Sequence, residues 1–323
     1  MTRFIFRRLA EALPLLLAVV VLNFLIIHMA PGDPIQALIG DFPAPPEYVA
    51  RVREQFGLDL PLWQQLLSYV LNVAQGDLGF SFANRRPVQE LLWERLGNTL
   101  ILTVSALVFA TCAGIALGIS AARRPRTWID KLVTFTSLLG FSIPVFWLGQ
   151  VLILFFAVKL DWLPAQGMIS SRESHEGLAY AADVASHLIL PALALSLRYL
   201  VSTARLTRTS MLEALGSDYI VTARAKGVRA MRLLYVHALP NALLPVVTSV
   251  GYNFGYVLAG SALIETVFSW PGLGRLLYDA MLARDTPVIL GIFLVGAGTA
   301  VIANLITDLA YGWLDPRIRQ RKP

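Results

Sequence analysis

A short stretch in the second half of the chain, 218–227, has residue types suited to contact with another molecule. Small residues let a second backbone approach closely, and interspersed cations suit an acidic groove. Glycine commonly follows the last residue of a helix, so we expect a short helix that ends at Gly227. An amphipathic stretch, 228–238, comes next. The residues that carry the pattern are Asp218, Tyr219, Thr222, Ala223, Arg224, Ala225, Lys226 and Gly227, followed by Leu239 and Pro240.

Two interpretations of this stretch follow from the residues alone. In the first, a short helix lies across one face of a membrane and is presented to a cytoplasmic partner. In the second, the stretch is a solvated linker whose cations bind anionic lipid headgroups. Composition and spacing leave both open.

The sequence contains none of the motifs that would give this chain a reaction of its own. It has no G-x-x-x-x-G-K-[ST] loop for nucleotide phosphates, no H-E-x-x-H and no G-x-S-x-G. The four histidines are scattered, and the one cysteine, Cys112, lies in an apolar run. We therefore predict no catalytic, cofactor-binding or metal-binding residue, and a chain that is not itself an enzyme.

Three charged residues stand out because they lie in or beside apolar runs. A cation near the middle of a bilayer costs about 2.5–3.5 kcal/mol on insertion scales, so Arg198 should face protein or water unless its side chain reaches the interface. Asp308 is an acid within the sixth apolar run, so it should likewise face protein or water. Glu265 is the first residue of a polar and aromatic block, 265–275. We expect that block to form a re-entrant or surface hairpin on the outer side, near a pathway, and the possible pathway-lining residues are Arg198, Glu265 and Asp308.

Composition shows what kind of elements position these residues. Of the 323 residues, 56% are apolar and only 15% are charged, against about 25% charged in soluble domains. The mean hydropathy is +0.62. These values exclude a disordered chain, a disulfide scaffold and an ordinary soluble enzyme, and they predict an all-α polytopic membrane protein. The six apolar runs long enough to span a bilayer are 9–30, 100–122, 132–158, 187–204, 239–264 and 287–314.

The distribution of charge predicts the orientation. The net charge is +6, but the cations flank apolar runs rather than gather on one polar face, so we expect no nucleic-acid partner. With both termini in the cytoplasm, 17 of the 27 Lys and Arg residues lie on the cytoplasmic side, as the positive-inside rule requires. The predicted parts are 1–30 (N-terminus and first span), 31–97 (an extracytoplasmic helical cap), 98–314 (a five-span core with the cytoplasmic segment 205–240) and 315–323 (a cytoplasmic tail).

The predicted cap contains three candidate helices. Residues 47–56 look helical, and Pro61 begins a stretch with apolar residues at the spacing of an amphipathic helix. A third helix, 87–96, leads into the second span. Such a cap suits either contact with a partner or a position on the membrane surface.

With these features together, the chain resembles the membrane permease subunits of bacterial binding-protein-dependent ABC importers, in the dipeptide, oligopeptide and nickel branch. The cytoplasmic signature of that family is EAA, three residues, Gly, nine residues, then I-x-L-P. Gly227 occupies the Gly position and Leu239–Pro240 the final two, while Val221 and Thr222 replace Glu and Ala, and His237 replaces Ile. Further blocks similar to the family are 28–34, 75–79, 142–149, 187–192, 265–275 and 314–317.

The resemblance implies a multi-pass protein of the bacterial inner membrane that forms half of a translocation pathway for dipeptides or oligopeptides. The implied partners are a second, similar permease, two cytoplasmic ATPase subunits, an extracytoplasmic substrate-binding protein and membrane lipid. ATP and Mg would bind to the ATPase subunits, not to this chain. The segment around 218–240 would couple to an ATPase. An ion-gradient-driven secondary transporter is the alternative function, and a glutathione-like peptide or a nickel chelate is the alternative cargo.

Overall fold

The computed structural model describes residues 2–29, 44–55, 60–170 and 176–314. The start of the predicted cap, 31–43, and the predicted tail, 315–323, lie outside the described residues. The chain divides into two compact units, one of 1–99 with 271–302 and one of 100–270 with 303–323. Each unit is considered by itself.

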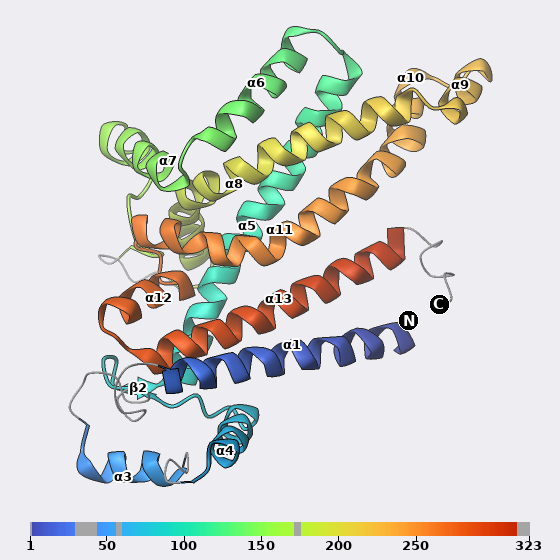
Figure 1. Ribbon diagram of the computed structural model, residues 1–323. Helices are drawn as coiled ribbons and strands as arrows, with labels where there is room; N and C mark the ends of the chain where they lie inside the picture. The colour runs from blue at the N-terminus through green and yellow to red at the C-terminus, as the bar shows by residue number, and fades with distance from the viewer. Residues whose placement is uncertain (1, 30–43, 56–59, 171–175, 315–323) are drawn as a thin grey trace. The chain divides into compact units, whose positions relative to one another are not determined.

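Helices make up nearly all of the regular structure (Figure 1). The α-helices are α1 (Thr2–Met29), α3 (Pro46–Gln55), α4 (Leu62–Ala74), α5 (Val88–Arg123), α6 (Trp128–Ser142), α7 (Val145–Leu152), α8 (Leu178–Leu215), α9 (Asp218–Ala225), α10 (Ala230–Arg232), α11 (Leu239–Val267), α12 (Leu273–Leu282) and α13 (Thr286–Leu314). The remaining elements are the strands β1 (Phe80–Ser81) and β2 (Arg86–Pro87) and two π-helices, η1 (Ile153–Lys159) and η2 (Leu233–Ala238).

The first unit contains α1, the elements from α3 to the first turns of α5, α12, and the N-terminal part of α13. Asn23 of α1 donates a hydrogen bond to the carbonyl of Leu290 in α13 at 3.1 Å. Gly291 allows α13 to approach the first turns of α5, because a Cβ there would lie 2.9 Å from the side chains of Leu92 and Val88. The unit is therefore held by close backbone packing and by a buried hydrogen bond.

A polar contact fixes the β1–β2 hairpin within the same unit. The strands pair antiparallel, with Phe80 opposite Pro87. Ser81 is fully buried, and its hydroxyl donates to the Asp285 carboxylate at 2.5 Å. Burial raises the pKa of Asp285, although hydrogen bonds from Ser81 and from the backbone of Val288 oppose that shift. The hairpin and the turn before α13 are thus tied together by a buried hydrogen bond.

The second unit is built around α8, which lies between α6 and α11 in Figure 1 and packs against both. Gly114 and Gly118 of α5 make the close approach to α8 possible. A Cβ at Gly118 would lie 2.5 Å from the Cβ of Thr207 and 2.6 Å from the carbonyl oxygen of Ala204. A buried apolar core that includes Leu102, Leu190, Ile264, Phe268 and Trp270 fills the space between α5, α8 and the end of α11.

Five helices among the described residues are long and apolar enough to cross a membrane. They correspond to the predicted spans one, two, four, five and six, and α8, with 38 residues, is much longer than the run predicted for it. The prediction of one unbroken helix over 132–158 is wrong, because the chain leaves the helix between α6 and α7. Pro144 lacks an N–H and disfavours helical geometry at Ile143, which accounts for the break.

The predicted cap differs in two details from the structure. The expected third helix, 87–96, is not separate but forms the first turns of α5, which continues without interruption to Arg123. The expected all-helical segment also contains the short β1–β2 hairpin. The other two helices agree with the prediction: α3 covers the predicted 47–56 to within a residue at each end, and α4 follows Pro61.

Candidate functional site

The segment predicted to bind a partner forms α9 and the turn that follows it. α9 and α10 lie beyond the ends of α8 and α11 (Figure 1). Ser217 precedes α9 in an extended conformation, and its carbonyl accepts hydrogen bonds from the backbone N–H groups of Ile220 and Val221. Asp218 places an acid in the first turn, where the helix dipole favours negative charge. These local features set where the short helix begins.

Gly227 ends α9, as the sequence predicts. Its φ is +80°, a left-handed conformation that glycine adopts without steric cost. The N–H of Gly227 donates to the carbonyl of Arg224 at 3.0 Å, and the N–H of Val228 donates to that of Ala223 at 3.2 Å. This pair of hydrogen bonds is a Schellman motif, which satisfies carbonyls that the end of a helix otherwise leaves free.

Ile220 is the main apolar contact between α9 and the rest of the second unit. Ile220 is fully buried. Its cluster includes Ile119 of α5, Met211 of α8, Leu234 of η2 and Ala242 of α11, and the half-buried Ala223 of α9 packs against it too. The short helix is therefore anchored to three long helices at once.

The opposite face of α9 is open. The predicted contact residues that are exposed are Asp218, Tyr219, Thr222, Arg224, Ala225, Lys226 and Gly227, while Ala223 is half-buried. No atom lies within 4 Å of a Cβ built on Gly227. The small and basic residues thus form an outward surface that a second molecule can approach.

The end of the predicted segment connects this surface to α11. Leu239 is half-buried against the Ile220 cluster, and Pro240 is the second residue of α11, which continues directly from η2. The Nδ2 of Asn241 donates to the hydroxyl of Tyr219 at 3.1 Å. This bond links the exposed face of α9 directly to the first turn of a long helix.

The three predicted pathway residues lie in different surroundings. Arg198 is exposed on α8, and Asp308 is partly buried on α13. Glu265, near the end of α11, is fully buried, and its carboxylate accepts a hydrogen bond from Ser261 at 3.0 Å. The described structure therefore places Glu265 in packed protein rather than on an open surface.

The residues that attach the segment were not predicted from the sequence. Ile220 and Asn241 were not singled out, although an isolated isoleucine in a polar stretch is a signal for burial. Arg205 was counted only as a topology signal, yet it lies on the same face of α8 as Arg198, seven residues further along.

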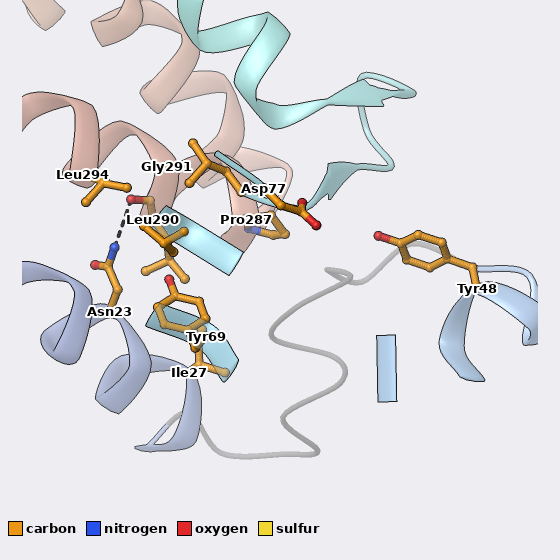
Figure 2. A pocket seen from close by; sticks show the side chains of 11 residues that line it. Asn23, Ile27, Tyr48, Tyr69, Asp77, Pro287, Leu290, Gly291 and Leu294 are labelled. Carbon is orange, nitrogen blue, oxygen red and sulfur yellow. Dashed lines mark hydrogen bonds between the residues drawn. The ribbon is translucent and has the colours of Figure 1, made fainter. Parts of the chain in front are cut away.

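A second cluster of polar residues lies in the first unit, around a small cavity of about 30 Å³ (Figure 2). Asn23 and Tyr69 point into it from α1 and α4, with Leu290 opposite. Burial raises the pKa of Tyr69 to about 12, despite a hydrogen bond with Asn23. Burial also raises the pKa of Tyr48, and the Asp77 carboxylate adds to that shift. The space suits one water molecule, so the cluster serves packing rather than the capture of a larger ligand.

Comparison with known proteins identifies the class. The family described as "Binding-protein-dependent transport system inner membrane component" matches residues 114–320, and the corresponding N-terminal family matches residues 1–103. The chain belongs to this family, in its dipeptide and oligopeptide branch, and is a permease subunit of an ABC importer. It is accordingly a multi-pass protein of the plasma membrane.

Curated relatives match the chain along its whole length. The dipeptide transport system permease protein DppB of Escherichia coli K12 is 42% identical, covering 100% of both chains. The di/tripeptide transport system permease protein DppB of Pseudomonas aeruginosa is 40% identical with the same coverage. The glutathione transport system permease protein GsiC of Escherichia coli K12 is 41% identical, covering 99% of this chain and 100% of its own.

A solved structure supports the fold alone. A chain from inward-facing conformations of the MetNI methionine ABC transporter is 18% identical, with a TM-score of 0.54. The likeness covers 70% of this chain and 96% of that one. The helical arrangement is therefore similar to that of an ABC transporter.

Proposed function

We propose that this chain forms half of the translocation pathway of an ATP-driven importer for dipeptides and oligopeptides. A second, similar permease supplies the other half, two cytoplasmic ATPase subunits bind beneath the pair, and an extracytoplasmic binding protein delivers the cargo. The names of the curated relatives support a peptide as the cargo. Glutathione remains an alternative cargo, since GsiC is almost as similar, and a nickel chelate is a third.

The observation that carries the proposal is the construction of α9. Its exposed face is small and basic, and its inward face carries the fully buried Ile220 with the half-buried Ala223 beside it. In the proposal, α9 inserts into a groove on one ATPase subunit. A movement of that subunit reaches α5, α8 and α11 together, because all three pack on the same cluster as Ile220.

Transport then follows from a shift between two packed arrangements of the permease pair. ATP bound to the ATPase subunits inside and the loaded binding protein outside both favour the same change of arrangement, from opposite sides of the membrane. This chain transmits the movement and hydrolyses nothing itself. ATP and Mg bind to the partner subunits.

The proposed topology has six crossings with both termini in the cytoplasm. The third crossing in chain order is formed by α6, α7 and η1 together, joined at Pro144. The distribution of Lys and Arg supports this orientation. Within it, Arg198 and Asp308 lie at membrane depth and face the pathway, and Glu265 lies near its outer end.

The test is to purify the chain in mild detergent from its native membrane and to count what accompanies it. A second permease and two ATPase subunits should be recovered, and ATP hydrolysis should rise when peptide and binding protein are added. An ion-gradient-driven transporter would purify without an ATPase. If no ATPase is recovered even after crosslinking from a cysteine placed at Ala225, the proposal fails.

A further inference from the structure

Four polar residues form one stripe along α8. Arg198, Ser202, Arg205 and Thr209 are spaced four, three and four residues apart, so they lie on the same side of the helix. Arg198, Arg205 and Thr209 are exposed, and Ser202 is half-buried. The opposite side of α8 packs closely on α5 through Thr203 and Thr207, against Gly114 and Gly118. The stripe therefore lies on the side of α8 that faces away from α5.

The C-terminal half of the stripe, Arg205 and Thr209, borders a hollow between α6 and α8. A cavity of about 310 Å³ is lined by Arg205, Arg208 and Thr209 of α8 and by Val133, Thr134 and Ser137 of α6. Three of the six lining residues carry hydroxyl groups and two carry guanidinium groups. A hollow with this lining favours water and anions over lipid chains.

One of the two arginines at the hollow is already neutralised. Arg208 binds the carboxylate of Asp130 through both Nε and Nη2, the latter at 2.9 Å. Among the residues that the structure describes, neither Arg205 nor Arg198 has an acidic partner. The stripe thus presents two positive charges, about two helical turns apart along α8.

These observations argue against a lipid-facing position for the stripe. A single arginine near the end of a span can extend its side chain to the membrane interface. Such a movement does not account for Ser202 between the arginines or for the polar hollow next to them. Arg198 and Ser202 lie within the predicted span 187–204, and Arg205 and Thr209 follow at its cytoplasmic end. Polar residues at membrane depth are turned toward protein or toward a water-filled cavity.

We propose that the stripe of Arg198, Ser202, Arg205 and Thr209 lines the inner half of the translocation pathway and binds the carboxylate of the peptide in transit. This inference rests on the proposed function. The guanidinium groups pair with carboxylates by two parallel hydrogen bonds, which suits the one charged group that every unmodified peptide carries at its C-terminal end. Two arginines in sequence offer the carboxylate consecutive sites along the path.

The first test measures access of water to the stripe. Single cysteines replace Arg198, Ser202, Arg205 and Thr209 in turn, in the assembled complex and in a Cys112→Ala background. A hydrophilic thiol reagent should label all four, and ATP should change the labelling. Thr207→Cys, on the packed side of α8, is the matched control and should stay unlabelled. Failure to label Arg198→Cys and Ser202→Cys, with labelling only by an apolar reagent, would place the stripe in lipid and overturn the proposal.

The second test measures the preference for a free C-terminal carboxylate in the cargo. Uptake of Ala-Gln is compared with uptake of Ala-Gln amide, whose C-terminal carboxylate is blocked, in proteoliposomes, with the loaded binding protein at saturation so that capture is not limiting. Arg198→Gln and Arg205→Gln should each lower the uptake of Ala-Gln several-fold relative to the amide, and Arg205→Glu should lower it further. Lys131→Gln, an exposed cation on α6, is the control and should leave the ratios unchanged.

The outcomes separate this inference from the proposed function. If the unaltered complex shows no ATP-driven uptake, the proposed function fails, and the labelling still decides whether the stripe faces water. If uptake is ATP-driven but the arginine variants keep the original ratios, the binding of carboxylates is wrong while the proposed function stands.

Discussion

At the scale of single residues, Ile220 decides whether α9 moves with the long helices. It is the one fully buried side chain among the described residues of α9, whereas its neighbour Val221 is 58% exposed. A force applied to the exposed face of α9 therefore reaches α5, α8 and α11 through the contacts of Ile220.

Replacing Ile220 with alanine should detach α9 from its cluster. Removal of a buried aliphatic side chain of this size costs about 2–5 kcal/mol, and here the loss falls on a short helix with no other fully buried side chain among its described residues. Amide hydrogen exchange over 217–227 should accelerate by at least about tenfold, and peptide uptake should fall while the level in the membrane is kept. Val221→Ala is the matched control. Equal exchange in the two variants would show that Ile220 is not the anchor.

The pair of Asp130 and Arg208 joins the start of α6 to α8. The hydrogen bond from Arg208 holds the pKa of Asp130 below its usual value, and burial opposes that shift. Because the pKa is lower in the folded chain than in the unfolded one, the pair stabilises the fold above about pH 4 and loses this effect as the pH falls through the lowered pKa.

The variant Asp130→Asn should lower the Tm of the purified chain by several degrees at pH 7. The difference between the variant and the original chain should shrink as the pH falls from about 4 through the lowered pKa, because Asp130 is protonated in both states of the original chain only below that lowered pKa. Glu94→Gln, which removes an exposed pair with Arg86, serves as the control and should have little effect. A difference in Tm that stays constant with pH would contradict the assignment.

At the scale of elements, α9 and its terminal glycine form a surface whose shape depends on the absence of a side chain. Asp and Asn have similar size, and both tolerate the left-handed conformation that Gly227 adopts. Gly227→Asp places a negative charge among the cations of α9, where an acidic groove of the partner would repel it. We expect Gly227→Asp to abolish uptake at a normal membrane level and Gly227→Asn to retain more. Undiminished uptake with Gly227→Asp would remove α9 from the coupling mechanism.

The packing of α5 on α8 makes a second prediction at this scale. A Cβ at Gly118 would meet the backbone of α8 at Ala204, and such overpacking costs about 1–3 kcal/mol. Gly118→Ala should therefore lower the Tm of the chain in detergent. Gly296→Ala, on a helix with open space around the glycine, should leave it unchanged or raise it. Equal values of Tm for the two variants would mean that α5 and α8 are not in close contact.

At the scale of the whole molecule, the sequence predicts helices better than it predicts their interruptions. Long apolar runs define α1, α5, α11 and α13 because a bilayer demands a continuous apolar stretch. The same criterion predicted α6 and α7 as one helix, because hydropathy carries no information about the hydrogen bond that Pro144 cannot make.

The candidate site shows a similar division. The exposed residues of α9 and the conformation of Gly227 follow from local residue types, which the sequence displays directly. The contact of Ile220 with Ile119 and Ala242, and the alignment of Arg205 with the hollow beside α6, depend on helices far apart in the chain. Periodicity along one helix gives a face but not the neighbour that the face meets.

The central claim, that ATP hydrolysis by partner subunits drives this permease, is tested most directly by the energy source of uptake. Vesicles that contain the complete complex receive labelled dipeptide and binding protein, with either ATP or an ion gradient supplied. The account predicts uptake with ATP alone, unaffected by a protonophore, and none with the gradient alone. Uptake that persists without ATP and collapses with the gradient would contradict it and establish a secondary transporter.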